Sequence, residues 1–263
     1  MYSPGMRLLP QKMRKTWIWL SATAVVTAAA CLVAFNQYVR LDTTSPATAR
    51  SRSAAHASFG SVDCREAKCV ALTFDAGPSE HSARLLDILK EEKVPATFFL
   101  LGKRHIDTYP DLVRRMADEG HELANHTWDH KRLTDMGADE IREEIERPNK
   151  EIAALVGRRP TLMRPPQGRT NNTVHEICRE LGMSEVLWSV TAKDYSTDDS
   201  ALIQKRVLEQ TERDGIILLH DLYDGTVPAV PGIIEGLKKR GYSFVTVPQL
   251  LAPGQAEPGK VYR

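Results

Sequence analysis

From residue 70 to residue 246 the sequence alternates short apolar runs with amphipathic segments of helical period. Seven apolar runs predict strands at residues 70–74, 96–101, 122–125, 161–164, 185–190, 215–219 and 243–246. Amphipathic helices are expected between them, and the one at 138–156 contains Pro148, which should kink or break it. Strands that alternate with helices form parallel sheets. The sequence therefore predicts an α/β fold, as either a closed (β/α) barrel or a doubly wound open sheet.

Polar side chains end or follow five of the predicted strands. They are Asp75, His126, Arg164, Asp194 and His220. In both candidate architectures, binding groups collect at the carboxyl ends of the strands. Each residue alone has an ordinary explanation, such as a helix N-terminal acid, a turn residue or an ion-pair partner. Their shared placement predicts one site at that edge of the sheet.

The histidine pair His126 and His130 is the first candidate for metal binding. Residues four apart fall on one face of a helical turn, and neutral imidazoles at that separation can bind one metal ion. The chain holds eight histidines, so a solvated pair on a loop is the alternative. The other strand-end residues favour the metal site.

The N-terminal region contains an uncharged apolar run at residues 16–35. Twenty helical residues span about 30 Å, the thickness of a bilayer core. Four basic residues precede the run, so we expect residues 1–15 to stay in the cytoplasm. The run is then a single-pass membrane anchor with the rest of the chain outside the cytoplasm. A cleaved signal peptide, with Ala28-Ala29-Ala30 near the cleavage site, is the alternative and predicts a secreted protein.

The region after the apolar run divides into a linker and an acidic globular part. Residues 36–67 are rich in Ser, Thr and Ala without an apolar period, which predicts a flexible extracytoplasmic linker. Seven of the 35 Lys and Arg and one of the 34 Asp and Glu lie in residues 1–60. The remaining 28 basic and 33 acidic residues give a net charge of −5. This acidic balance gives no support for nucleic-acid binding, and no protein partner is predicted.

Two cysteines precede the first predicted strand. Export makes disulfides possible, and Cys64 and Cys69 could close a small loop. Two free thiols are the alternative. Cys178 falls on a predicted helix and is expected to be a buried thiol.

In order along the chain, the strand-end motifs resemble those of the polysaccharide deacetylase family, also called the NodB-homology domain or carbohydrate esterase family four. The motifs are Thr73-Phe74-Asp75-Ala76-Gly77-Pro78, His126-Thr127-Trp128-Asp129-His130, Arg164-Pro165-Pro166-Gln167-Gly168, Trp188-Ser189-Val190-Thr191-Ala192-Lys193-Asp194-Tyr195 and Leu218-Leu219-His220. The resemblance covers residues 68–251 and leaves 252–263 as a C-terminal tail. It implies a distorted, incomplete (β/α) barrel with about seven parallel strands.

The resemblance also implies metal-dependent removal of acetyl groups from a polysaccharide, usually from N-acetylglucosamine in chitin or peptidoglycan. His126 and His130 would bind a divalent metal, usually zinc, which would hold the attacking water. Asp75 would be the general base, and His220 would protonate the departing amine. Arg164 would orient Asp75, and Asp194 would orient His220.

The substrate-binding residues follow from the same resemblance. The backbone N–H of Gln167, after Pro166, would stabilise the oxyanion. Leu218 and Tyr195 would shape a pocket for the acetyl methyl group. No cofactor beyond the metal is expected, because no Gly-rich phosphate-binding motif appears.

The sequence departs from the family at the third metal ligand. The family has an aspartate where this chain has Ala76, and alanine has no ligand atom. A catalytic zinc site usually has three protein ligands. Asp129, Ser79 or an extra water could replace the missing group.

Gln167 and Thr191 also depart from the family, since they replace a common aromatic residue and an aspartate.

The sequence leaves three hypotheses about the function. They are an active deacetylase with an altered metal site, a glycan-binding pseudoenzyme, and an unrelated (β/α) protein with chance matches.

Overall fold

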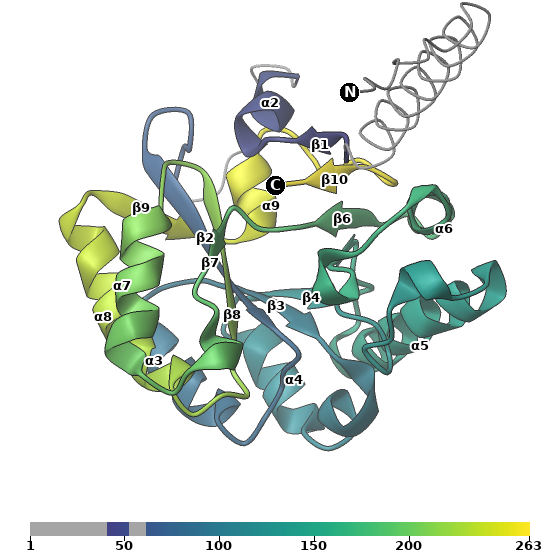
Figure 1. The fold of residues 1–263 in the computed structure, drawn as a ribbon, viewed down its shortest axis with the longest axis horizontal. Helices are drawn as coiled ribbons and strands as arrows, with labels where there is room; N and C mark the ends of the chain where they lie inside the picture. The colour runs from purple at the N-terminus through teal and green to yellow at the C-terminus, as the bar shows by residue number, and fades with distance from the viewer. Residues whose placement is uncertain (1–40, 53–61) are drawn as a thin grey trace, which may run out of the picture. The chain divides into compact units, whose positions relative to one another are not determined.

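The computed structural model describes residues 41–52 and 62–263. Within these residues it contains one ten-stranded sheet in which every pairing is parallel (Figure 1). The strands are β1 (Thr43–Thr44), β2 (Lys68–Asp75), β3 (Thr97–Leu100), β4 (Glu122–Asn125), β5 (Leu162–Met163), β6 (Ser184–Val186), β7 (Val190–Thr191), β8 (Gly215–His220), β9 (Tyr242–Val245) and β10 (Val261–Tyr262).

The helices are α2 (Pro46–Ser51), α3 (Ser82–Glu92), α4 (Pro110–Asp118), α5 (Ala138–Val156), α6 (Asn172–Glu180), α7 (Ser200–Gln210), α8 (Thr226–Lys239) and α9 (Val247–Leu251). Helices α3, α4, α5, α7 and α8 lie around the outside of the curved sheet, whereas α9 packs with Ala71 and Phe99 of its inner face (Figure 1). Short helical turns are η1 (Gly102–Ile106), η2 (Leu133–Asp135), η3 (Pro166–Gly168) and η4 (Asp194–Ser196). Helix α5 runs through Pro148 as one helix, so of the expected kink or break the break does not occur.

Strand β2 organises the sheet. The strand order is β1-β10-β6-β5-β4-β3-β2-β8-β7, and β9 pairs with the first half of β2. The two end strands, β1 and β7, do not pair with each other in the part of the chain that the structure describes. This arrangement confirms the distorted, incomplete (β/α) barrel with parallel strands.

The pleat of β2 explains how the sheet carries both a core and a site. Alternate residues of a strand point to opposite faces. Val70, Leu72 and Phe74 pack in the main core cluster beneath the helices. Thr73 and Asp75 belong to the opposite face and are also buried. Asp75 is the last residue of the strand, so its carboxylate reaches the carboxyl edge of the sheet.

The predicted strand at 185–190 is divided into β6 and β7. The guanidinium of Arg164 lies at the division, where its Nε donates to Val186 O (2.9 Å) and its Nη2 to Leu187 O (3.1 Å). The interruption of the predicted strand therefore coincides with the place where its carbonyls bind a residue of the site.

The described parts of the expected linker and tail are ordered. Strand β10, from the expected tail, pairs with β1 on one side and β6 on the other. Helix α2 is tied down by Arg50, which donates to Leu250 O (2.8 Å) and pairs with Asp214. The composition of these segments does not predict this order, because the partners that anchor them lie far away in sequence.

No helix in residues 41–52 and 62–263 is long and apolar enough to cross a membrane. The predicted anchor or signal at 16–35 lies outside the described residues, as do residues 1–15 and part of the linker.

Cys64 and Cys69 form a disulfide next to the start of β2, and Cys178 is a buried free thiol.

The disulfide predicts a stability difference. A disulfide restricts the unfolded chain, and the loop-entropy model gives a stabilisation of about 2 kcal/mol for a loop this short. We expect the Cys64→Ser/Cys69→Ser variant to lose about 2 kcal/mol in free energy of unfolding. Urea titration of the oxidised wild type and the variant measures this difference. Equal stabilities would contradict a stabilising role for the bond.

Candidate active site

The structure brings the five strand-end residues together. Asp75 and His220 end β2 and β8 and are direct neighbours in the register of these strands. His126 follows β4, Arg164 follows β5, and Asp194 starts η4 after β7. Their side chains are linked by the contacts described below. The predicted site therefore exists as a cluster at the carboxyl edge of the sheet.

Arg164 holds Asp75 by a buried ion pair. Nη1 of Arg164 donates to Asp75 Oδ1 at 2.6 Å and to Thr73 Oγ1 at 2.8 Å. Arg164 is completely buried, and Asp75 is 2% exposed. The guanidinium occupies one carboxylate oxygen, so the other, Oδ2, is left facing His126 Nε2 at 3.8 Å.

His126 is fixed in one orientation by its own hydrogen bond. Its Nδ1 lies 2.7 Å from Arg164 O. A carbonyl can only accept, so Nδ1 carries the proton and Nε2 keeps a free lone pair. Burial lowers the pKa of His126 to about 4, which makes the ring neutral at physiological pH. A neutral imidazole with its second nitrogen bound to a carbonyl is the usual state of a metal ligand.

His130 completes the pair from the solvent-facing side. The two rings lie 4.9 Å apart between centroids at an interplanar angle of 61°. Partial desolvation also lowers the pKa of His130. The residues between the histidines form a loop, with positive φ at Thr127 (72°) and His130 (53°). The helical turn that the spacing predicts is therefore not formed, and this loop brings the two histidines together.

Asp194 holds His220 on the other side of Asp75. Asp194 Oδ1 lies 2.9 Å from His220 Nδ1, and Oδ2 accepts from the backbone N–H of His220 at 2.7 Å. Thr226 Oγ1 also donates to Oδ2 at 2.9 Å. Burial by itself would lower the pKa of His220. The hydrogen bond to Asp194 and the negative charges of Asp194 and Asp75 outweigh this effect, so the pKa of His220 is raised. His220 is therefore arranged to hold a proton.

The predicted substrate residues surround this cluster differently. Leu218 and Pro166 are buried, and Tyr195 is 56% exposed with its ring 6.1 Å from that of His220. Gln167 is exposed and has a positive φ of 60°. Tyr223, which the sequence did not single out, has its ring centroid 5.4 Å from that of His220.

The donor set supports a divalent metal in part. Two neutral imidazoles suit zinc and similar ions. Ala76 offers no side-chain ligand, and no group of three possible ligands closes on one point in the described part of the chain. The two side chains expected as substitutes are engaged elsewhere. Asp129 pairs with Lys103 (3.1 Å), and Ser79 Oγ donates to Asp221 O (2.8 Å).

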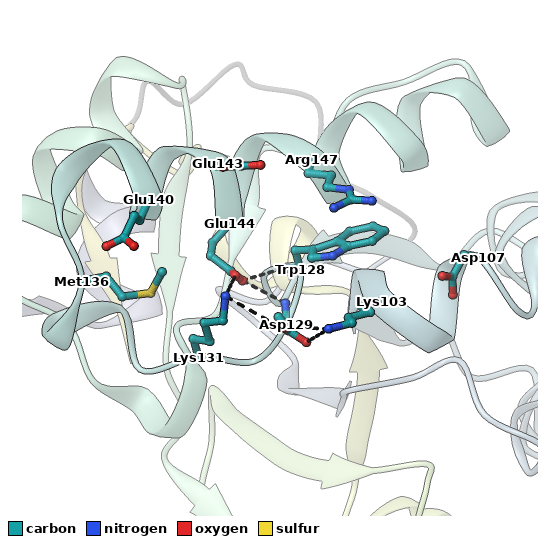
Figure 2. Close-up of a pocket in the computed structure, with 10 residues that line it drawn as sticks. All are labelled: Lys103, Asp107, Trp128, Asp129, Lys131, Met136, Glu140, Glu143, Glu144 and Arg147. Atoms are coloured by element: carbon teal, nitrogen blue, oxygen red, sulfur yellow. Dashed lines mark hydrogen bonds and ion pairs between the residues drawn. The ribbon is translucent and has the colours of Figure 1, made fainter.

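A cavity of about 470 Å³ borders the histidine loop at Trp128 and Asp129 (Figure 2). Charged side chains of η1, the loop and α5 line it, together with Trp128 and Met136. None of the five strand-end residues lines it. The cavity is therefore separate from the cluster of Asp75 and His220.

Asp221 is a buried acid that the motifs did not reveal. It follows His220, is fully buried, and accepts a hydrogen bond from Ser82 Oγ. Its carboxylate lies against Gly77, where an added Cβ would come within 2.4 Å of Oδ1. Only glycine fits there, and the contact fixes the chain after Asp75 against β8.

The burial of Asp221 predicts that the free energy of unfolding depends on pH. Burial raises its pKa from 3.8 to about 6, so the folded state keeps a proton that the unfolded state releases between these values. Stability therefore falls as pH rises through this window, and above it a buried charge remains. We expect Asp221→Asn to unfold at a higher temperature than the wild type at pH 8, with a smaller difference at pH 5.

Thermal unfolding of the full chain at both pH values measures this effect. Asp224→Asn is the matched control, because Asp224 is an exposed acid in the same loop. A gain for Asp221→Asn that is no larger at pH 8 than at pH 5 would contradict the buried charge.

Comparison with known proteins agrees with the motifs and the fold. The profile of the family described as polysaccharide deacetylase matches residues 63–186. The chain is 37% identical over 196 residues to the peptidoglycan-N-acetylglucosamine deacetylase PgdA of Listeria monocytogenes, covering 74% of this chain and 41% of that protein. It is 37% identical over 186 residues to the peptidoglycan-N-acetylglucosamine deacetylase of Bacillus cereus, covering 69% and 67%.

Among solved structures, one described as T48 deacetylase with substrate superposes with a TM-score of 0.74 at 40% identity. The match covers 77% of this chain and all of that one. The chain spans about two fifths of the length of PgdA.

Proposed function

The chain belongs to the polysaccharide deacetylase family, and we propose that it removes acetyl groups from amino sugars of a cell-wall polysaccharide. One observation carries the proposal. Asp75 and His220 stand side by side on β2 and β8, and each has a buried partner suited to an opposite proton-transfer role.

The reaction is hydrolysis of the amide between the acetyl group and the sugar nitrogen. Asp75 Oδ2 takes a proton from the attacking water, while Arg164 holds Oδ1 in place. His220 gives its proton to the departing amine, and Asp194 keeps that proton available. The products are acetate and a free amino sugar.

A divalent metal, zinc in the first place, would polarise the acetyl carbonyl and make the attacking water more acidic when bound by His126 and His130. The backbone N–H of Gln167 stabilises the oxyanion. Leu218 and Tyr195 contact the acetyl methyl group and the sugar.

Peptidoglycan is the proposed polymer, since the relatives named above are peptidoglycan deacetylases. Such a substrate requires export, which residues 16–35 would provide as an anchor or as a cleaved signal. The second candidate function is a glycan-binding pseudoenzyme, and Ala76 is the observation that favours it.

The proposal predicts acetate release from acetylated peptidoglycan or chitin oligosaccharides by the full chain with added Zn2+. Asp75→Asn removes the base and keeps the shape, and a general base is worth about 100-fold or more in rate. We expect at least that loss, measured as acetate formed per minute. Binding of glycan with no acetate from the wild type would favour the pseudoenzyme.

The site also predicts that a third ligand improves metal binding. Ala76 has a φ of 62°, a conformation that aspartate tolerates better than most residues. Ala76→Asp supplies the missing carboxylate, so we expect Zn2+ to bind at least about tenfold more tightly, or about 1.4 kcal/mol. Calorimetric titration of metal-free protein measures this affinity.

Ala76→Ser is the matched control, because it adds a polar side chain without a carboxylate. Equal Zn2+ affinity in the wild type and Ala76→Asp would show that another group already fills the third position.

A further inference from the structure

The loop between the two histidines is held in an unusual conformation. Thr127 and His130 both have positive φ, and Thr127 is β-branched, for which this region is rare. A strained loop persists only when its surroundings fix it. The relative position of His126 and His130 therefore depends on groups outside the pair.

The backbone groups of the loop bind partners from other segments. Gly102 N–H donates to Thr127 O at 3.0 Å, and Lys103 N–H donates to Trp128 O at 2.8 Å. Asn125 Oδ1 accepts from the N–H of Thr127 at 2.6 Å. These bonds fix the carbonyls and the first N–H of the loop.

The next two N–H groups converge on one side chain of helix α5. Glu144 Oε2 accepts from the N–H of Trp128 at 3.1 Å and from the N–H of Asp129 at 2.8 Å. Glu144 is 5% exposed, and Lys131 Nζ lies 3.2 Å from its other oxygen. Figure 2 shows the carboxylate pointing from the helix into the loop.

Packing of the Trp128 side chain also holds the loop in place. The guanidinium of Arg147, one turn along α5 from Glu144, lies 3.6 Å from the centroid of the indole (Figure 2). On the other side an added Cβ at Gly102 would come within 2.1 Å of the ring. The indole is packed between η1 and α5, so α5 holds the loop both through Arg147 at the ring and through Glu144 at the backbone.

We propose that Glu144 is a positioning residue for the metal site: its carboxylate sets the backbone of residues 127–129 so that His126 and His130 face each other before the metal arrives. The inference rests on the proposed function, because the histidine pair is the metal site of that proposal. Glu144 lies 14 residues beyond His130 and in none of the motifs.

The test is binding of Co2+ to the metal-free full chain, followed by visible absorption, which reports both affinity and coordination. Glu144→Ala removes the acceptor of both N–H groups. We expect Co2+ to bind about 10- to 100-fold more weakly, the usual effect of losing an outer partner of a metal ligand. We also expect an altered Co2+ spectrum. Glu144→Gln keeps one acceptor oxygen and should recover most of the affinity and the wild-type spectrum.

Glu143→Ala is the matched control, since Glu143 is exposed, neighbours Glu144 and lines the same cavity. It should bind Co2+ like the wild type. Thermal unfolding of the metal-free proteins separates the roles, because a merely structural glutamate would lower the melting temperature without changing the Co2+ spectrum of the folded protein. If Glu144→Ala does not fold, Glu144→Gln decides, with a measurable loss of affinity expected because its amide is a weaker acceptor than a carboxylate.

Wild-type Co2+ affinity and spectrum in Glu144→Ala would overturn the inference and leave the proposed function intact. If Glu144→Ala does not fold, wild-type affinity in Glu144→Gln would overturn it. Failure of the wild type itself to bind Co2+ would overturn both the inference and the metal site of the proposed function.

Discussion

The rest of the site depends on the interactions of one buried group, the guanidinium of Arg164. A buried charge is costly unless it is paired and hydrogen-bonded. Arg164 meets this requirement with the carboxylate of Asp75, the hydroxyl of Thr73 and two carbonyls at the division between β6 and β7. The same side chain therefore joins the division between β6 and β7 to the end of β2 and fixes the proposed base.

The site is built from two buried pairs with opposite proton-transfer roles. In one pair a cation holds a carboxylate that has one oxygen free to accept a proton. In the other a carboxylate raises the pKa of His220 against the effect of burial. Because β2 and β8 are adjacent and in register, the acceptor and the donor of protons stand beside each other. This is the arrangement that hydrolysis of an amide needs.

Local signals were enough to predict a parallel α/β fold and the five strand-end residues, whereas the incomplete barrel and the roles of those residues were expected only from the resemblance to the family. Apolar runs mark the strands, and polar residues at strand ends mark the carboxyl edge. The conformation of the histidine loop could not be predicted, since a spacing of four fits a helix as well as a turn. Glu144 was missed because a glutamate on an amphipathic helix looks like an ordinary solvated residue. Asp221 was missed because its burial depends on Gly77 and Ser82, which are far away in sequence.

The pH dependence of kcat/KM for acetate release tests the central claim most directly. If His220 is the general acid, activity falls on the alkaline side as its raised pKa is passed. In Asp194→Asn the hydrogen bond to a charged partner is lost while the burial remains, so the alkaline limb should move to lower pH. An alkaline limb at the same pH in both proteins would contradict the account.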